Sequence, residues 1–219
     1  FPVAKQVMDF YFTRKPKLER EYQQLVVREN NNSMIANSTD YFILDIEYNT
    51  GDKTRFDLIG VYWPSDSSAR KLAGKFKPHL VVFEMKYGDK ALSNTSGMIK
   101  HSKDFHTFTN DQARVDAFRK DMLTVFEQKR ALGLIPCLGM DGKANSNKVT
   151  AFYETLDLVF LLVNHDPASG ILRRELDDLV NARMDKQCSF ISSNFLGYGL
   201  YKENLLSFDE FMNRFPAQI

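Results

Sequence analysis

Cysteine, glycine and proline are scarce in this sequence, and long apolar runs are missing. Its 219 residues include 2 cysteines, Cys137 and Cys188, which lie far apart without metal-ligand spacing. This pattern argues against a disulfide scaffold or a zinc module and favours a reducing, cytoplasmic setting. The 11 glycines and 7 prolines are too few for a fibrous or low-complexity chain. The longest apolar block, Leu158 to Val163, is far shorter than the roughly 18 residues of a membrane span, so we expect a soluble protein.

The sequence also lacks an excess of charge of either sign, because the formal net charge is only +1. The whole molecule therefore gives no signal for or against nucleic acid, although a local basic surface is compatible with this balance. A composition of 43% hydrophobic and 26% charged residues is typical of a folded core, and the length favours one domain over residues 1–219.

Since the chain begins at Phe1 without an initiator Met or a signal-like apolar segment, we interpret it as excised or processed from a longer chain.

The hydrophobic periodicity predicts an α/β fold with a mixed sheet. The expected helices cover Lys17–Asn30, Asn94–Phe108, Asp111–Leu132, Ser169–Ala182 and a short stretch from Ser207. The expected strands cover Tyr41–Asn49, Thr54–Trp63, His79–Tyr87, Leu134–Leu138, Leu156–Asn164 and Cys188–Ser192. Turn chemistry at Thr50 to Lys53 predicts that the first two strands form an antiparallel hairpin. The polar segments Pro64–Pro78 and Gly139–Asn147 are expected to be loops.

The third strand carries two charges within an apolar run. Side chains alternate along a strand, so Glu84 and Lys86 point to one face while Phe83, Met85 and Tyr87 point to the other. Burying such charges is costly unless they are paired or bind a ligand. An ion pair on a solvent-facing side of the strand is the simpler explanation, and the same Glu-x-Lys string recurs at Glu127 on a predicted helix.

Asp57 on the preceding strand gives the string a context. It is flanked by apolar residues, and pairing of neighbouring strands would bring its carboxylate within reach of Glu84. Mg²⁺ is commonly bound by one or two carboxylates together with waters and phosphate oxygens. Asp57, Glu84 and Lys86 are therefore the candidate site.

Asp57 followed by Glu84-Met85-Lys86 on the next strand, with a carboxylate-bearing helix before and a helix after, resembles the PD-(D/E)xK superfamily of restriction-endonuclease-like nucleases. The resemblance spans roughly Leu18 to Val163 and implies an α-β-β-β-α-β core with extra helices. It implies that Asp57 and Glu84 hold Mg²⁺, with Mn²⁺ as an alternative, and that Lys86 acts on the attacking water. The implied activity is phosphodiester hydrolysis in nucleic acid, in DNA before RNA, and a homodimer is compatible with it.

The resemblance is incomplete at three points. Phe56 stands where the proline of the family name would be, the spacer between Asp57 and Glu84 is long, and His101 occupies the following helix where some members have a glutamine. Several branches place a metal-binding Glu on the first helix. Glu21 is our first choice for that role, with Glu19 and Glu29 as the other candidates.

Several further residues have both a functional and an ordinary interpretation. Asp45 and Glu47 share a strand face and could join the metal or face solvent, and His165-Asp166-Pro167 is typical of a turn. His79 and His106 have no partner at ligand spacing. Basic residues flank the candidate strand and could contact phosphates or simply be solvated, namely Arg70, Lys71, Lys75, Lys77, Lys90, Lys100 and Lys103.

Three hypotheses therefore remain at this point. The first is a divalent-metal-dependent nuclease. The second is a nuclease-like fold without activity that binds nucleic acid or another protein. The third is an unrelated α/β domain in which Glu84 and Lys86 form an exposed ion pair.

Overall fold

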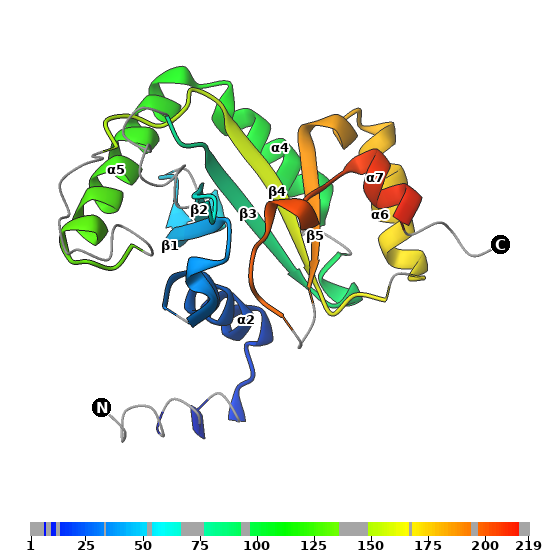
Figure 1. The fold of residues 1–219 in the computed structure, drawn as a ribbon. Helices are drawn as coiled ribbons and strands as arrows, with labels where there is room; N and C mark the ends of the chain where they lie inside the picture. Colours follow the sequence, from blue (N-terminus) through cyan, green and yellow to red (C-terminus); the bar gives the residue numbers. More distant parts are fainter. Residues whose placement is uncertain are drawn as a thin grey trace.

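A computed structural model describes residues 7, 10, 11, 14–32, 34–51, 54–66, 77–92, 97–135, 149–166, 168–193 and 197–214. The fold is mixed α/β, with a six-stranded mixed sheet and five α-helices in this part of the chain (Figure 1). The strands are β1 (Tyr41–Asn49), β2 (Arg55–Tyr62), β3 (Leu80–Tyr87), β4 (Leu156–Val163), β5 (Cys188–Ser193) and β6 (Leu206–Ser207). The helices are α2 (Leu18–Val27), α4 (Met98–Thr109), α5 (Gln112–Ala131), α6 (Gly170–Asn181) and α7 (Phe208–Arg214).

The strands lie side by side in chain order, from β1 to β6. β1, β2 and β3 form an antiparallel meander, β3, β4 and β5 are parallel, and β6 pairs antiparallel with β5. The predicted hairpin of the first two strands is confirmed. The parallel pairs are joined through helices, because a crossover connection is needed between parallel neighbours. Along the chain, β3 is followed by the short helix Asp89–Leu92 and then by α4.

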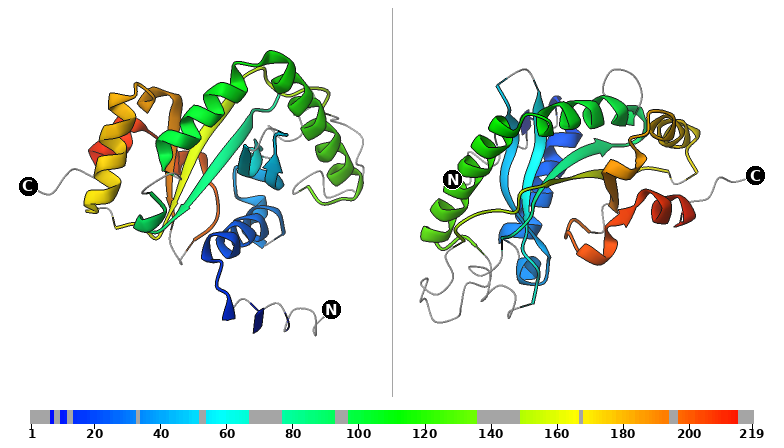
Figure 2. Two further views of the ribbon diagram at one scale, coloured as in Figure 1. Left: turned by 180° about the vertical axis from the view of Figure 1, so that it is seen from behind. Right: turned by 90° about the horizontal axis from the view of Figure 1, so that it is seen from above.

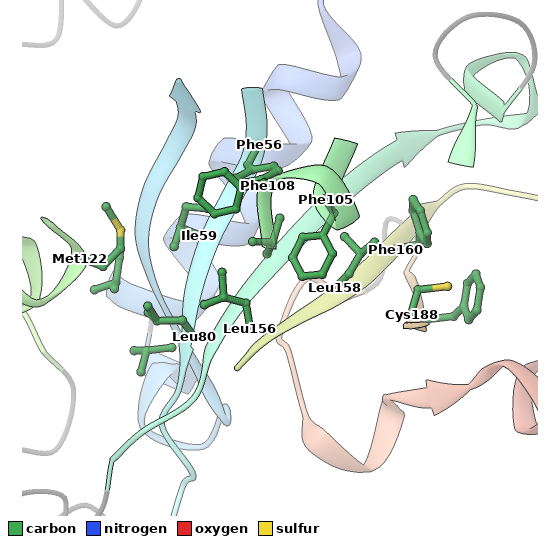
Figure 3. Close-up of a cluster of buried hydrophobic side chains, with 14 of the residues drawn as sticks. Phe56, Ile59, Leu80, Phe105, Phe108, Met122, Leu156, Leu158, Phe160 and Cys188 are labelled. Atoms are coloured by element: carbon green, nitrogen blue, oxygen red, sulfur yellow. The ribbon is translucent and has the colours of Figure 1, made fainter. Parts of the chain in front are cut away.

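Two apolar cores cover the two faces of the sheet. The larger core lies under α4, α5 and α6, where aromatic residues such as Phe56, Phe105 and Phe108 pack together (Figure 3). The smaller core lies under α2 and includes Phe83 and Met85 of β3. Figure 2 shows the helices on either side of the strands. Because β3 is covered on both faces, its apolar character is nearly continuous.

Most predicted elements are observed with boundary shifts of a few residues, and local capping explains two of the helix starts. Asp111 accepts a hydrogen bond from the backbone of Arg114 at the start of α5, and Ser169 caps α6 in the same way. The predicted strand at Leu134–Leu138 is not seen in its described part, since residues 134 and 135 lie outside any strand and 136–138 lie outside the described residues. The loop expected at Gly139–Asn147 and most of Pro64–Pro78 also lie outside them.

The apolar spacing of the first helix predicts one buried face with Leu18, Tyr22, Leu25 and Val26, and the structure bears this out in part. Tyr22 and Val26 are buried, but Leu18 is 43% exposed and the polar Gln23 is buried with them. The packed side thus includes the polar Gln23, which apolar periodicity could not identify. None of the described helices is long and apolar enough to cross a membrane. Cys188 is a buried free thiol, and Cys137 lies outside the described residues.

Candidate functional site

The site lies where β2 and β3 separate. Their pairing ends at Leu58 opposite Phe83, so the next residues of β3 pair only with β4. The backbone N–H of Met85 points to the side that β2 has left, and it donates to the Asp57 carboxylate at 2.9 Å. The side chain of Asp57 thus replaces the missing strand partner. This hydrogen bond fixes the carboxylate beside the strand that carries Glu84.

Glu84 and Lys86 face the larger core, as strand alternation predicts. Glu84 is 2% exposed and Lys86 is 3% exposed, and the Lys86 ammonium donates to Oε1 of Glu84 at 3.0 Å. The expectation of a solvent-exposed ion pair is therefore wrong: the two residues are paired, but they are buried. His101 of α4 reaches the same oxygen through Nδ1 at 2.8 Å.

The surroundings shift the pKa values of Glu84 and Asp57 in opposite directions. Burial alone would raise the pKa of Glu84, but the hydrogen bond from His101 and the charge of Lys86 together hold that pKa below its ordinary value. Burial raises the pKa of Asp57 well above its ordinary value, and the negative charge of Glu84 raises it further. The surroundings therefore favour the ionised form of Glu84 and disfavour that of Asp57.

A cavity of about 540 Å³ opens over these residues. Its acidic lining consists of Glu19, Asp57 and Glu84. Its other lining residues are mostly basic or polar, namely Asn49, Thr54, Arg55, Lys86, Ala91, Lys100 and His101. Carboxylates surrounded by cationic groups suit a ligand that carries both a cation and an anion.

The first-helix carboxylate in this cavity is Glu19, whereas neither Glu21 nor Glu29 lines it. Glu19 lies one turn before the buried Tyr22 and Gln23, whereas Glu21, two positions further along, is on a different face of the helix from Glu19. Burial raises the pKa of Glu19, and its charge interacts with Lys86 and Glu84. The geometry favours Glu19 over our first choice, Glu21.

The flanking basic residues divide into distinct groups. Arg55 and Lys100 line the cavity, Lys100 also bonding to Asp104 at 2.5 Å. Lys77 pairs with Glu154 before the start of β3 and does not line the cavity. Lys90 and Lys103 are exposed near the cavity without lining it. Arg70, Lys71 and Lys75 lie outside the described residues.

His165, which we interpreted as part of a turn, belongs to the support of this site. It follows β4, and its side chain is 3% exposed. Nε2 lies 2.9 Å from the backbone carbonyl oxygen of Lys86, and Nδ1 lies 3.0 Å from Asp89 in the short helix Asp89–Leu92. The carbonyl can only accept, so Nε2 carries a proton. His165 therefore ties the end of β3 to β4 and to the segment that follows β3.

None of the other candidates lines the cavity. The Asp45 carboxylate accepts from the backbone of Ile46, and Glu47 pairs with Arg20 and Arg55. His79 stacks on Tyr153 near Asp157, and His106 is exposed on α4. No metal-site role for these residues follows from their contacts.

The donor set of the cavity fits a hard divalent cation with few protein ligands. Among the described residues no group of three or more His, Cys, Asp or Glu is arranged to enclose a metal ion. Mg²⁺ does not need such a cage, because it usually keeps several waters and uses one or two carboxylates plus phosphate oxygens. The raised pKa of Asp57 indicates a carboxylate that a nearby cation would stabilise. Asp57 and Glu84, with Glu19 nearby, could hold such an ion.

Neither the family models, nor the curated proteins, nor the solved structures with which the chain was compared gave a match. The functional argument consequently depends on the site itself.

Proposed function

We propose that this protein is a divalent-metal-dependent nuclease that hydrolyses phosphodiester bonds, with DNA as a better substrate than RNA. The observation that carries the proposal is the burial of Asp57, Glu84 and Lys86 in one cavity. Burying an ionisable group costs roughly several kcal/mol of folding free energy for each charge that is left unpaired. An apolar core would do the same structural work at lower cost, so we infer that the charges are kept for chemistry.

The element order supports a restriction-endonuclease-like assignment. α2, β1, β2, β3, α4 and β4 follow the order α-β-β-β-α-β, and α5, α6 and the later elements are additions to it. Asp57 on β2 and Glu84 and Lys86 on β3 occupy the positions that the resemblance assigns to the metal ligands and the lysine.

The roles of the residues follow from their chemistry. Asp57 and Glu84 would hold Mg²⁺ or Mn²⁺, and Glu19 would contribute from α2. A bound metal ion supplies Lewis-acid polarisation of the phosphate and a water of lowered pKa. Lys86 would orient the attacking water and stabilise the negative charge that develops on the phosphoryl oxygens. Arg55 and Lys100 would contact neighbouring phosphates without reading sequence.

An assay on defined substrates tests the proposal. The protein is incubated with single- and double-stranded DNA and RNA in Mg²⁺, in Mn²⁺ and in EDTA. We expect metal-dependent cleavage that Lys86→Met lowers by at least about 100-fold, since its loss removes stabilisation of the transition-state charge. Lys77→Ala is the matched control, because this lysine precedes the same strand but does not line the cavity.

The outcomes separate the hypotheses. Cleavage that Lys86→Met leaves unchanged, or that persists in EDTA, contradicts the proposed site. Metal-independent binding of nucleic acid without cleavage by any form of the protein would instead support the silent nuclease-like module.

A further inference from the structure

His101 is a cavity residue whose role the resemblance does not supply. It stands in the first turn of α4 and its side chain is 18% exposed. Its Nδ1 atom lies 2.8 Å from Oε1 of Glu84, the oxygen that also accepts from Lys86. A carboxylate accepts hydrogen bonds and does not donate them, so Nδ1 carries the proton in this contact.

The two donors distinguish the two oxygens of Glu84. A carboxylate oxygen has two lone pairs, so Oε1 is fully engaged by Lys86 and His101. Oε2 accepts no hydrogen bond from the part of the chain that the structure describes. The imidazole of His101 thus fixes the rotation of the carboxylate and leaves one defined oxygen for a ligand.

The position of His101 is itself set by α6. The carboxylate of Glu175 accepts from the backbone N–H of Met98 at 3.1 Å and so satisfies one of the free N–H groups at the start of α4. Gly97 allows this contact, because a Cβ there would lie 2.6 Å from Oε2 of Glu175. The end of α4 that carries His101 is therefore held in place from a second helix.

We infer that His101 is a positioning residue that orients Glu84 for a divalent cation. The inference rests on the proposed function, because it requires that Glu84 holds the metal. Hydrogen-bond partners of metal ligands typically contribute about 10- to 100-fold to metal affinity. His101 acts through Glu84 and needs no contact of its own with the metal or the substrate.

Binding of Mn²⁺ alone, measured by isothermal titration calorimetry without nucleic acid, tests this role. We expect His101→Ala to weaken Mn²⁺ binding by about 10- to 100-fold. His101→Asn should recover most of the affinity, because the asparagine amide nitrogen can take the place of Nδ1 and donate to Oε1. His101→Gln is the matched control, since its amide nitrogen corresponds to Nε2 and lies too far along the side chain.

The outcomes keep the inference separate from the proposed function. A wild-type protein that binds no Mn²⁺ overturns both. Wild-type affinity in His101→Ala overturns only the role of His101. Recovery by His101→Gln but not by His101→Asn also overturns that role, because it would assign the function to Nε2 and not to Nδ1. Far-ultraviolet circular dichroism of each variant establishes that the fold is retained. A purely structural role would shift thermal stability without this pattern of rescue.

Discussion

The Asp57 carboxylate, which the proposed function needs in its ionised form, lowers the stability of the fold when it is ionised. Its pKa is raised by burial and by Glu84, so the folded protein holds the proton more tightly than the unfolded chain does. The ionised form therefore destabilises the fold. This cost is absent below the ordinary pKa of 3.8, grows as the pH rises past that value, and is complete above the raised pKa of the folded state.

Asp57→Asn should consequently stabilise the metal-free protein at neutral pH while abolishing cleavage. The asparagine oxygen can still accept from Met85, so only the charge is removed. We expect a gain of about 1 kcal/mol, which corresponds to about 2–4 °C in Tm for a chain of this size. Thermal melts in EDTA at pH 7 and at pH 4 provide the measurement. A gain that is as large at pH 4 as at pH 7 would contradict the electrostatic explanation.

Single residues also show what the sequence could and could not predict. Strand alternation is local, so the shared face of Glu84 and Lys86 was predicted and is confirmed. The choice between Glu19 and Glu21 depends on the rotation of α2, which tertiary packing sets by burying Gln23 and exposing Leu18. The turn signal at His165-Asp166 was also incomplete. Asp166 does accept from the backbone of Ala168, but His165 turns inward to β3.

At the scale of elements, the end of β3 is held by β4 through His165. Replacing it with alanine removes the Nε2 donor to the Lys86 carbonyl and the contact of Nδ1 with the Asp89 carboxylate. We expect His165→Ala to lower the free energy of unfolding by about 1–3 kcal/mol and to slow cleavage, because the strand that positions Lys86 is loosened. Urea unfolding and initial rates measure the two effects. His106→Ala, an exposed histidine on α4, should change neither.

The junction of α4 and α6 gives a steric prediction. In Gly97→Ala the new Cβ would lie 2.6 Å from Glu175 and 2.9 Å from the Leu92 carbonyl oxygen. Such overpacking typically costs about 1–3 kcal/mol, and here it also displaces the turn that carries His101. Gly170→Ala is the matched control, since its Cβ would meet no atom within 4 Å. Urea denaturation should show a lower free energy of unfolding only for the Gly97 variant. Equal free energies of unfolding for the two variants would contradict the packing argument.

The elements themselves were largely predictable because their patterns are strong and local. The alternating and continuous apolar runs identify β1 to β5, and α5 has a well-spaced buried face. The two-residue strand β6 and the short helix after β3 are too brief to have a periodicity. The Glu-x-Lys string on α5 is also partly buried, since Glu127 pairs with Arg130 and its side chain is only 21% exposed. Its surroundings depend on how α5 packs on β1, which no local pattern encodes.

At the scale of the whole molecule, the sheet order explains why the site forms. Residues far apart in the chain meet because β3 is central, with β2 leaving on one side and α4 returning over the face beside it. The sequence indicated the strand and its neighbour, but the separation of β2 from β3 that opens the cavity is a tertiary feature. His101 and Glu19 reach the cavity only through that arrangement.

The burial of the candidate residues at the bottom of the cavity also predicts the form of the substrate. Its volume of about 540 Å³ lies in the range of small-ligand pockets, and the catalytic candidates Asp57, Glu84 and Lys86 are almost fully buried. A paired duplex is wide and stiff, so one strand must leave the helix before its phosphate can approach these residues. Unpairing and unstacking cost a few kcal/mol, whereas an unpaired strand bends in without that cost.

We therefore expect single-stranded DNA to be cleaved at least about tenfold faster than a fully paired duplex of the same sequence. Initial rates on the two substrates give the ratio, and a duplex with a short central mismatch should fall between them, since part of the unpairing cost is already met. The comparison is made at one salt concentration, because phosphate contacts are salt-dependent. Equal rates on paired and unpaired DNA would mean that the cavity admits a duplex backbone directly, and the argument from burial would fail even though the nuclease activity stood.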